Sequence, residues 1–161
     1  SLIDDWDTYR QSLNTALSLC DVLKVSEVDL VELYPDCNPI DELRRLQEEH
    51  HISLAILTRG AEGSIARTLD GVVSQAPALP IQHHGDMVGS GDTFQGATTF
   101  WLTERFEKPH TQVHGLQADE LHQMLIFANT AAGLNCQQTG CEPPTRAEVD
   151  ALIETEWWLN D

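Results

Sequence analysis

The chain has 161 residues, enough for one domain with a buried core, and 41% of them are hydrophobic against 22% charged. With 26 acidic residues against 9 Lys and Arg, the formal net charge is −17. This charge repels nucleic-acid phosphates and anionic lipids, so we expect neither nucleic acid nor membrane as a partner. It does not exclude a nucleotide, because a helix N-terminus and a metal ion can hold phosphates locally.

The cysteine pattern argues against a zinc-binding protein, and the hydropathy pattern argues against a membrane-spanning or secreted one. The four cysteines (Cys20, Cys37, Cys136 and Cys141) form no Cys-x-x-Cys pair and stand at no zinc-finger spacing. The chain contains neither an apolar run long enough to span a membrane nor a basic and then apolar leader. We therefore expect a cytoplasmic protein without a zinc site.

Helical and strand-like patterns alternate through the first 58 residues. Apolar residues three or four apart predict helices, and short continuous apolar runs predict buried strands. The expected elements are a helix over 5–19, a strand over 21–25, a helix over 26–32, a helix over 40–50 and a strand over 52–58. Ser26 is the expected N-cap of its helix, with Asp29 at the capping-box position.

The second part of the chain begins with a hairpin pattern. Asp70-Gly71, a dipeptide favoured in tight turns, separates the strand-like segments 64–68 and 72–75. The elements expected after it are a short strand over 79–84, a glycine-rich loop over 85–91, helices over 92–103 and 117–137, and a last helix opened by a capping box at 145–148. Strands alternating with helices predict a single α/β domain over 1–161, with a mostly parallel sheet interrupted by one hairpin.

The strongest local pattern is Asp86-Met-Val-Gly-Ser-Gly-Asp-Thr-Phe-Gln-Gly-Ala97. Gly89 and Gly91 let the backbone approach a ligand, and the helix expected from Asp92 presents free N–H groups and a positive dipole end. Together they suit a phosphoryl group in transfer, with Asp92 taking the proton of the attacking hydroxyl. A tight turn with Asp92 as N-cap is the alternative. The segment matches neither a Walker A loop nor the dinucleotide-binding fingerprint.

The same segment closely resembles the second signature of the PfkB carbohydrate kinases, D-T-x-G-A-G-D-x-F. Further resemblances follow in the family's order: Lys24–Asp29 to K-x-N-x-x-E, Leu57–Ser64 to T-x-G-x-x-G, and Asn129–Ala132 and Gly140–Pro144 to the late helix and the loop after it. The resemblance runs from about residue 15 to 155. It implies the C-terminal part of a ribokinase-like, three-layer α/β/α fold.

The resemblance also implies a reaction, the phosphorylation of a sugar hydroxyl by ATP. Asp92 would be the general base, and the backbone N–H groups of Gly89, Ser90 and Gly91 would stabilise the developing charge. The implied nucleotide contacts are Ser26, Thr58, Gly60, Gly63, Gly91 and Asn129. A structural role at a strand end is the alternative for Thr58, and a polar position on a helix surface is the alternative for Asn129.

Two metal sites are implied in the same way. The side chain of Asp86 and the carbonyl groups of Val88, Cys136 and Gly140 would bind a monovalent cation such as K⁺, whereas a solvated turn is the alternative for Asp86. Asp29 would be associated with Mg²⁺. The sequence departs from the family here, since Ser26-x-x-Asp29 replaces Asn-x-x-Glu and Met87 stands where Thr is common.

Family members carry a first glycine-rich signature, most sugar contacts and a lid before this region. None of these is visible, and the chain opens on Ser1. We therefore expect a fragment of a longer, fructokinase-like enzyme that is inactive by itself, and a homodimeric parent is compatible with the resemblance. The sugar is not identified. The alternatives are a nucleotide-binding or regulatory module without catalysis, and a structural fragment whose glycine loop is only a turn.

Overall fold

The structure is a computed structural model that describes residues 5–81 and 85–159. Its helices are α1 (Trp6–Leu17), α2 (Glu27–Leu33), α3 (Pro39–His50), α4 (Ser90–Arg105), α5 (Pro109–Gln112), α6 (Ala118–Asn135) and α7 (Arg146–Ile153). Its strands are β1 (Val22–Ser26), β2 (Leu54–Thr58), β3 (Ser64–Thr68) and β4 (Val73–Ala76). Short 3₁₀ turns lie at Gly60–Glu62, Val113–Gly115 and Trp157–Leu159.

The four strands form one sheet in the order β1-β2-β3-β4. β1 and β2 run parallel, whereas β2–β3 and β3–β4 are antiparallel pairs. The expectation of a mostly parallel sheet therefore does not hold for this part of the fold, which has a mixed sheet. The reason is the length of the connections, because a parallel crossover needs about a dozen residues and the turns after β2 and β3 are shorter.

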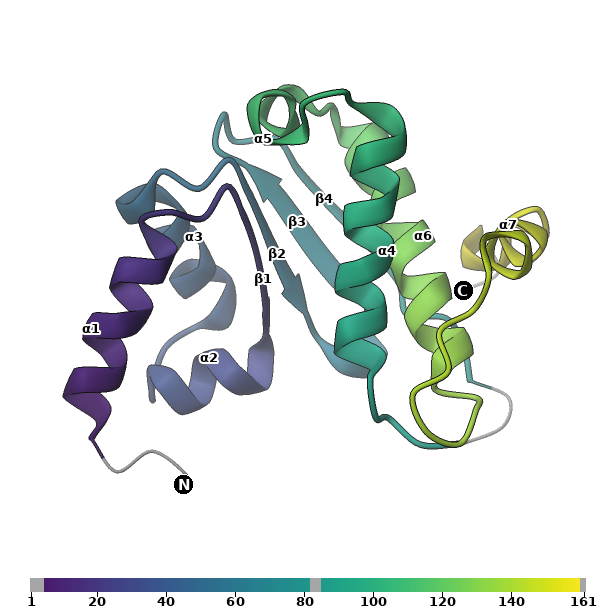
Figure 1. Cartoon of the computed structure of the whole chain (residues 1–161), viewed down its shortest axis with the longest axis horizontal. Helices are drawn as coiled ribbons and strands as arrows, with labels where there is room; N and C mark the ends of the chain where they lie inside the picture. Colours follow the sequence, from purple (N-terminus) through teal and green to yellow (C-terminus); the bar gives the residue numbers. More distant parts are fainter. Residues whose placement is uncertain (1–4, 82–84, 160–161) are drawn as a thin grey trace.

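Helices cover both faces of the sheet and give the expected three layers (Figure 1). Leu54 and Ile56 of β2 pack with α4 and α6, whereas Ala55 and Leu57 pack with α1, α2 and α3. All four side chains are fully buried. A strand buried on both faces has a continuous apolar sequence, which is why the segment 52–58 predicts a strand.

The caps, turns and apolar patterns of the sequence predict most helix and strand boundaries to within two residues of those in the structure. The Ser26 hydroxyl accepts a hydrogen bond from the Asp29 N–H at 3.1 Å, which confirms it as the N-cap of α2. The capping box at the start of α7 is also confirmed. The expected strand over 79–84 is not formed at 79–81, and 82–84 lie outside the described residues. No helix in the described part of the chain is both long and apolar enough to cross a membrane.

Candidate functional site

Helix α4 follows the glycine-rich loop as the sequence predicts, but it begins two residues earlier than expected. The helix begins at Ser90 and not at Asp92, because Gly89 adopts the left-handed conformation (φ 75°) that N-caps it. The Thr93 N–H donates to the Gly89 carbonyl at 2.8 Å, and the Ser90 N–H donates to Met87 at 3.2 Å. The N–H groups of Gly91 and Asp92 have no acceptor among the described residues. These two groups are therefore the free donors at this end of the helix.

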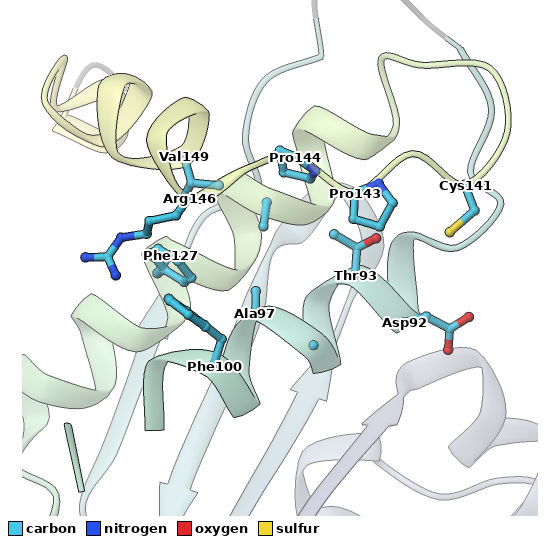
Figure 2. A pocket seen from close by; sticks show the side chains of 12 residues that line it. Asp92, Thr93, Ala97, Phe100, Phe127, Cys141, Pro143, Pro144, Arg146 and Val149 are labelled. Carbon is cyan, nitrogen blue, oxygen red and sulfur yellow. The ribbon is translucent and has the colours of Figure 1, made fainter. Parts of the chain in front are cut away.

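Asp92 stands in the first turn of α4 and is exposed. Its carboxylate forms no hydrogen bond or ion pair with the other described residues. Figure 2 shows this carboxylate directed away from Thr93 and Ala97, on the side of the helix toward the strands. The turn alternative, in which Asp92 is the N-cap, is wrong because Gly89 is the cap. An unpaired carboxylate next to free N–H donors can accept a proton from a hydroxyl held there.

Residues of the predicted cation site lie together where two loops meet. The Asp86 carboxylate accepts the N–H of Val88 at 2.9 Å and the N–H of Gly140 at 2.7 Å. The Gly85 N–H donates to the Cys136 carbonyl at 3.0 Å, and the Asn135 amide donates to the Val88 carbonyl at 2.9 Å. Asp86 thus joins the glycine loop to the loop after α6 and is more than a solvated turn residue. Among the described residues no cluster of His, Cys, Asp and Glu has the arrangement of a metal centre.

Cys141 and Cys136 both lie against the glycine-rich loop. A Cβ atom on Gly89 would lie 2.1 Å from the Cys141 sulfur, so only glycine fits there. Burial raises the pKa of the Cys136 thiol; a hydrogen bond with Ser90 partly opposes this rise, and the charge of Asp86 adds to it. The two thiols therefore differ, since Cys141 is exposed and Cys136 is buried.

Ser26 and Thr58, two of the predicted nucleotide contacts, are the last residues of β1 and β2 and lie at the same end of the sheet. Ser26 lies opposite Thr58 in the parallel register, and the Ser26 hydroxyl donates to the Asp29 carboxylate at 2.6 Å. Gly60 and Gly63 follow in the next turn, both with positive φ. A Cβ on Gly63 would lie 2.1 Å from the Ala76 carbonyl oxygen, so this glycine has a packing role in addition to any ligand contact.

Asn129 lies inside the domain at the same end of the sheet, since Ser64, its hydrogen-bond partner, pairs with Thr58. It is 7% exposed, so the alternative of a helix-surface position is wrong. Its amide donates to the carbonyls of Ala76 (3.3 Å) and Pro77 (2.8 Å), and its carbonyl accepts the Ser64 hydroxyl at 3.1 Å. The side chain thus braces α6 against β3 and the end of β4.

An apolar pocket of ≈ 320 Å³ opens between α4, α6 and the chain entering α7 (Figure 2). Its lining residues are Asp92, Thr93, Gly96, Ala97, Phe100, Phe127, Ala131, Cys141, Pro143, Pro144, Arg146 and Val149. The Arg146 guanidinium lies over the rings of Phe100 (5.5 Å) and Phe127 (5.6 Å). Sequence reasoning missed this pocket, because its lining comes from three separate segments that only the packing of α4, α6 and α7 brings together.

The comparisons with known proteins agree with this fold and loop. The family model described as pfkB family carbohydrate kinase matches residues 2–148. A fructokinase of Klebsiella pneumoniae is 32% identical over 93 residues, which are 58% of this chain and 30% of that protein. The family match covers most of the chain, which therefore belongs to the pfkB family of carbohydrate kinases.

Solved structures show the same ribokinase-like fold. The fructokinase of Xylella fastidiosa with bound ATP superposes with a TM-score of 0.76 at 22% identity, over 89% of this chain and 45% of that one. A provisionally assigned ribokinase II of E. coli, in complex with ATP and Mg²⁺, gives 0.69 at 23% identity, over 91% and 43%. The chain thus spans less than half the length of each of these relatives.

Proposed function

We propose that the protein containing this chain transfers the terminal phosphoryl group of ATP to a sugar hydroxyl, and that this chain supplies the base and part of the phosphate site. The supporting observation is the exposed, unpaired carboxylate of Asp92 beside the free N–H groups of Gly91 and Asp92. Family membership and the fructokinase and ribokinase neighbours support the same class of substrate.

In the proposed reaction, the Asp92 carboxylate accepts the proton of the sugar hydroxyl. The hydroxyl oxygen bonds to the terminal phosphorus, the bond from that phosphorus to the bridging oxygen breaks, and ADP leaves. The free N–H groups at the start of α4 donate to the phosphoryl oxygens as their charge develops. Ser90 has a smaller share than the sequence suggested, because its N–H already donates to Met87.

The proposal includes a divalent ion, for which Ser26 and Asp29 offer oxygen donors of the kind that Mg²⁺ prefers. A bound Mg²⁺ would neutralise charge on the nucleotide phosphates. It also includes a monovalent cation near Asp86, whose carboxylate lies against Val88 and Gly140, two of the residues whose carbonyls the family resemblance implies as ligands. Thr58, Gly60, Gly63 and Asn129 remain in the proposal as residues that border the nucleotide.

A second candidate is a nucleotide-binding module without catalysis. The observation that favours it is the closed Ser26–Asp29 pair, whose hydroxyl and carboxylate are bonded to each other at 2.6 Å. The test is a calorimetric titration of the chain with MgADP, followed by a coupled assay of the parent enzyme against a panel of sugars. Binding with sugar-dependent ADP release supports the kinase. Binding without turnover on any sugar supports the module, and a folded chain that binds no nucleotide contradicts both.

A further inference from the structure

Asn135, the last residue of α6, is fully buried and has a polar atom without a partner. Its amide nitrogen, Nδ2, donates to the Val88 carbonyl at 2.9 Å. Its amide oxygen, Oδ1, accepts no hydrogen bond from any described residue. The large majority of buried side-chain oxygens have a partner, because an unpaired polar atom away from water costs free energy. The Asn135 oxygen therefore points to a group that these parts of the chain do not supply.

This oxygen lies beside groups that the family resemblance implies as ligands of a monovalent cation. Asn135 precedes Cys136 in the chain and is hydrogen-bonded to Val88. Because the oxygen and nitrogen of a carboxamide are about 2.2 Å apart, Asn135 Oδ1 lies within about 5 Å of the Val88 carbonyl oxygen. Oxygen ligands stand about 2.3–2.6 Å from Ca²⁺ and further from the larger K⁺, so two oxygens at this separation can share one ion.

The charge at this junction suits one monovalent cation. The half-buried Asp86 carboxylate accepts two backbone N–H groups and forms no ion pair with a Lys or Arg of the described segments. Asn135 adds an oxygen without adding charge. No group of three or more His, Cys, Asp and Glu side chains gathers here or elsewhere in the described segments. One carboxylate with neutral oxygens balances a single positive charge, which favours a monovalent ion over a divalent one.

Hydrogen bonds hold this junction in place without an ion. The Gly85 N–H donates to the Cys136 carbonyl at 3.0 Å, and the Asp86 N–H donates to the Gln138 carbonyl at 3.0 Å. A Cβ on Gly85 would overlap the Gln138 carbonyl, so the two backbones are in direct contact. The buried Asn135 side chain is therefore positioned in advance, and little ordering is needed when an ion binds.

From these observations we infer that Asn135 supplies a side-chain oxygen ligand to the monovalent cation, an inference that rests on the cation of the proposed function. The two ends of its amide have separate roles, since Nδ2 orients the Val88 carbonyl and Oδ1 contacts the ion. Val88 precedes Gly89, the N-cap of α4. A bound ion thus also stabilises the turn from which α4 presents Asp92.

The experiment measures thermal unfolding of the parent enzyme, without nucleotide or sugar, in KCl and in choline chloride at equal ionic strength. A ligand that binds only the folded state raises the unfolding temperature as its concentration increases. We expect KCl to raise it for the unmodified enzyme, and Asn135→Ala to lower the K⁺ affinity obtained from this rise by about 10-fold or more. Asn135→Asp keeps an oxygen and removes the donor, so K⁺ should still stabilise this variant.

The matched control is Asn129→Ala, because Asn129 is also a buried asparagine of α6 but has partners at both ends of its amide. It should lower the unfolding temperature in both salts and leave the K⁺ dependence unchanged. If Asn135→Ala does not fold by circular dichroism, Asn135→Val takes its place under the same criteria.

Three results would overturn the ligand role of Asn135. They are an unmodified enzyme indifferent to K⁺, an unchanged K⁺ affinity in Asn135→Ala, and an Asn135→Asp variant as indifferent to K⁺ as Asn135→Ala, which would leave Asn135 as a brace for the Val88 carbonyl. Sugar phosphorylation is assayed on the same preparations. Turnover that accompanies any of these results leaves the proposed function standing, whereas a folded parent enzyme with neither nucleotide binding nor turnover overturns the proposed function itself.

Discussion

Asp92 combines three properties that a general base in phosphoryl transfer requires. It is exposed, its carboxylate is unpaired among the described residues, and it stands beside two N–H groups that can hold the phosphoryl oxygens. The sequence predicted the base and the N–H donors because glycines before a helix start leave the backbone accessible to an anion, but it left open a tight turn with Asp92 as N-cap, which only the observed cap at Gly89 excludes. The sequence could not show that the Lys24 ammonium lies 3.1 Å from where a Cβ on Gly91 would stand, since this position depends on the pairing of β1 with β2 and on the packing of α4 across the sheet.

The proposed base predicts a large kinetic effect of one substitution. In the parent enzyme, Asp92→Asn should lower kcat by about 100-fold to 10,000-fold, the usual contribution of general acid–base catalysis. The KM for ATP should change little, because the carboxylate meets the sugar hydroxyl. Steady-state kinetics with both substrates varied measures this effect. Asp70→Asn, in the hairpin turn after β3, is the matched control, and a variant at position 92 with near-normal turnover would remove Asp92 from the mechanism.

The two cysteines beside the glycine loop predict a difference in reactivity. Only the thiolate is alkylated, and burial raises the pKa of Cys136, so that less of it is ionised at a given pH. Cys20 and Cys37 also have pKa values raised by burial. We expect iodoacetamide at about pH 8 to modify the exposed Cys141 first, with Cys136 following only at higher pH or on unfolding. Mass spectrometry of digests taken at successive times measures the order in which the cysteines are alkylated. Equal alkylation rates at Cys136 and Cys141 would contradict the structure.

At the scale of elements, strands were easier to predict than their directions. The apolar run of β2 and the Asp70-Gly71 turn identified β2, β3 and β4, but the mixed sheet follows from short connections whose effect on direction becomes evident only in three dimensions. The strand expected over 79–84 is absent at 79–81. Helix α6 is buried around most of its circumference, so its pattern could not show that Asn129 faces inward. The start of α4 was placed two residues late, because its first residues are Ser and Gly, which favour helices weakly.

The turn that opens α4 predicts a measurable coupling between two loops. Gly89→Ala is disfavoured by the positive φ of 75° and by contact of the new Cβ with the Cys141 side chain. Gly71→Ala is the control, because its φ of 91° imposes similar strain and nothing lies within 4 Å of the new Cβ. We expect Gly71→Ala to lower the free energy of unfolding by about 1 kcal/mol and Gly89→Ala to lower it by about 2–4 kcal/mol.

The coupling itself appears in a double-mutant cycle. Cys141→Gly removes both atoms that would clash, so Gly89→Ala in that background should cost about 1 kcal/mol, as Gly71→Ala does. Urea denaturation followed by circular dichroism gives the four values. Strictly additive changes would show that Cys141 does not contact Gly89 in solution.

At the scale of the whole molecule, the chain contains the proposed base and phosphate-binding groups, whereas no sugar-binding residue is proposed in it. Asp92, the free N–H groups and Lys24 meet at the start of α4. Thr58 is the last residue of β2, and Gly60 and Gly63 lie in the turn that follows it. β1 is an edge strand with partly exposed apolar residues, and Phe100 is exposed to 40% beside the apolar pocket. Unpaired edges and apolar surface of this kind favour association with another polypeptide.

This distribution predicts how the 161-residue chain behaves alone. Phosphoryl transfer depends on positioning both reactants, and the chain spans less than half the length of its solved relatives. We expect weak binding of MgADP, no sugar-dependent turnover, and self-association that increases with concentration. Calorimetry, a coupled kinase assay and sedimentation velocity test the three parts, with the parent enzyme as the positive control. Efficient sugar phosphorylation by the purified chain would show that the other parts of its relatives are dispensable for positioning the sugar.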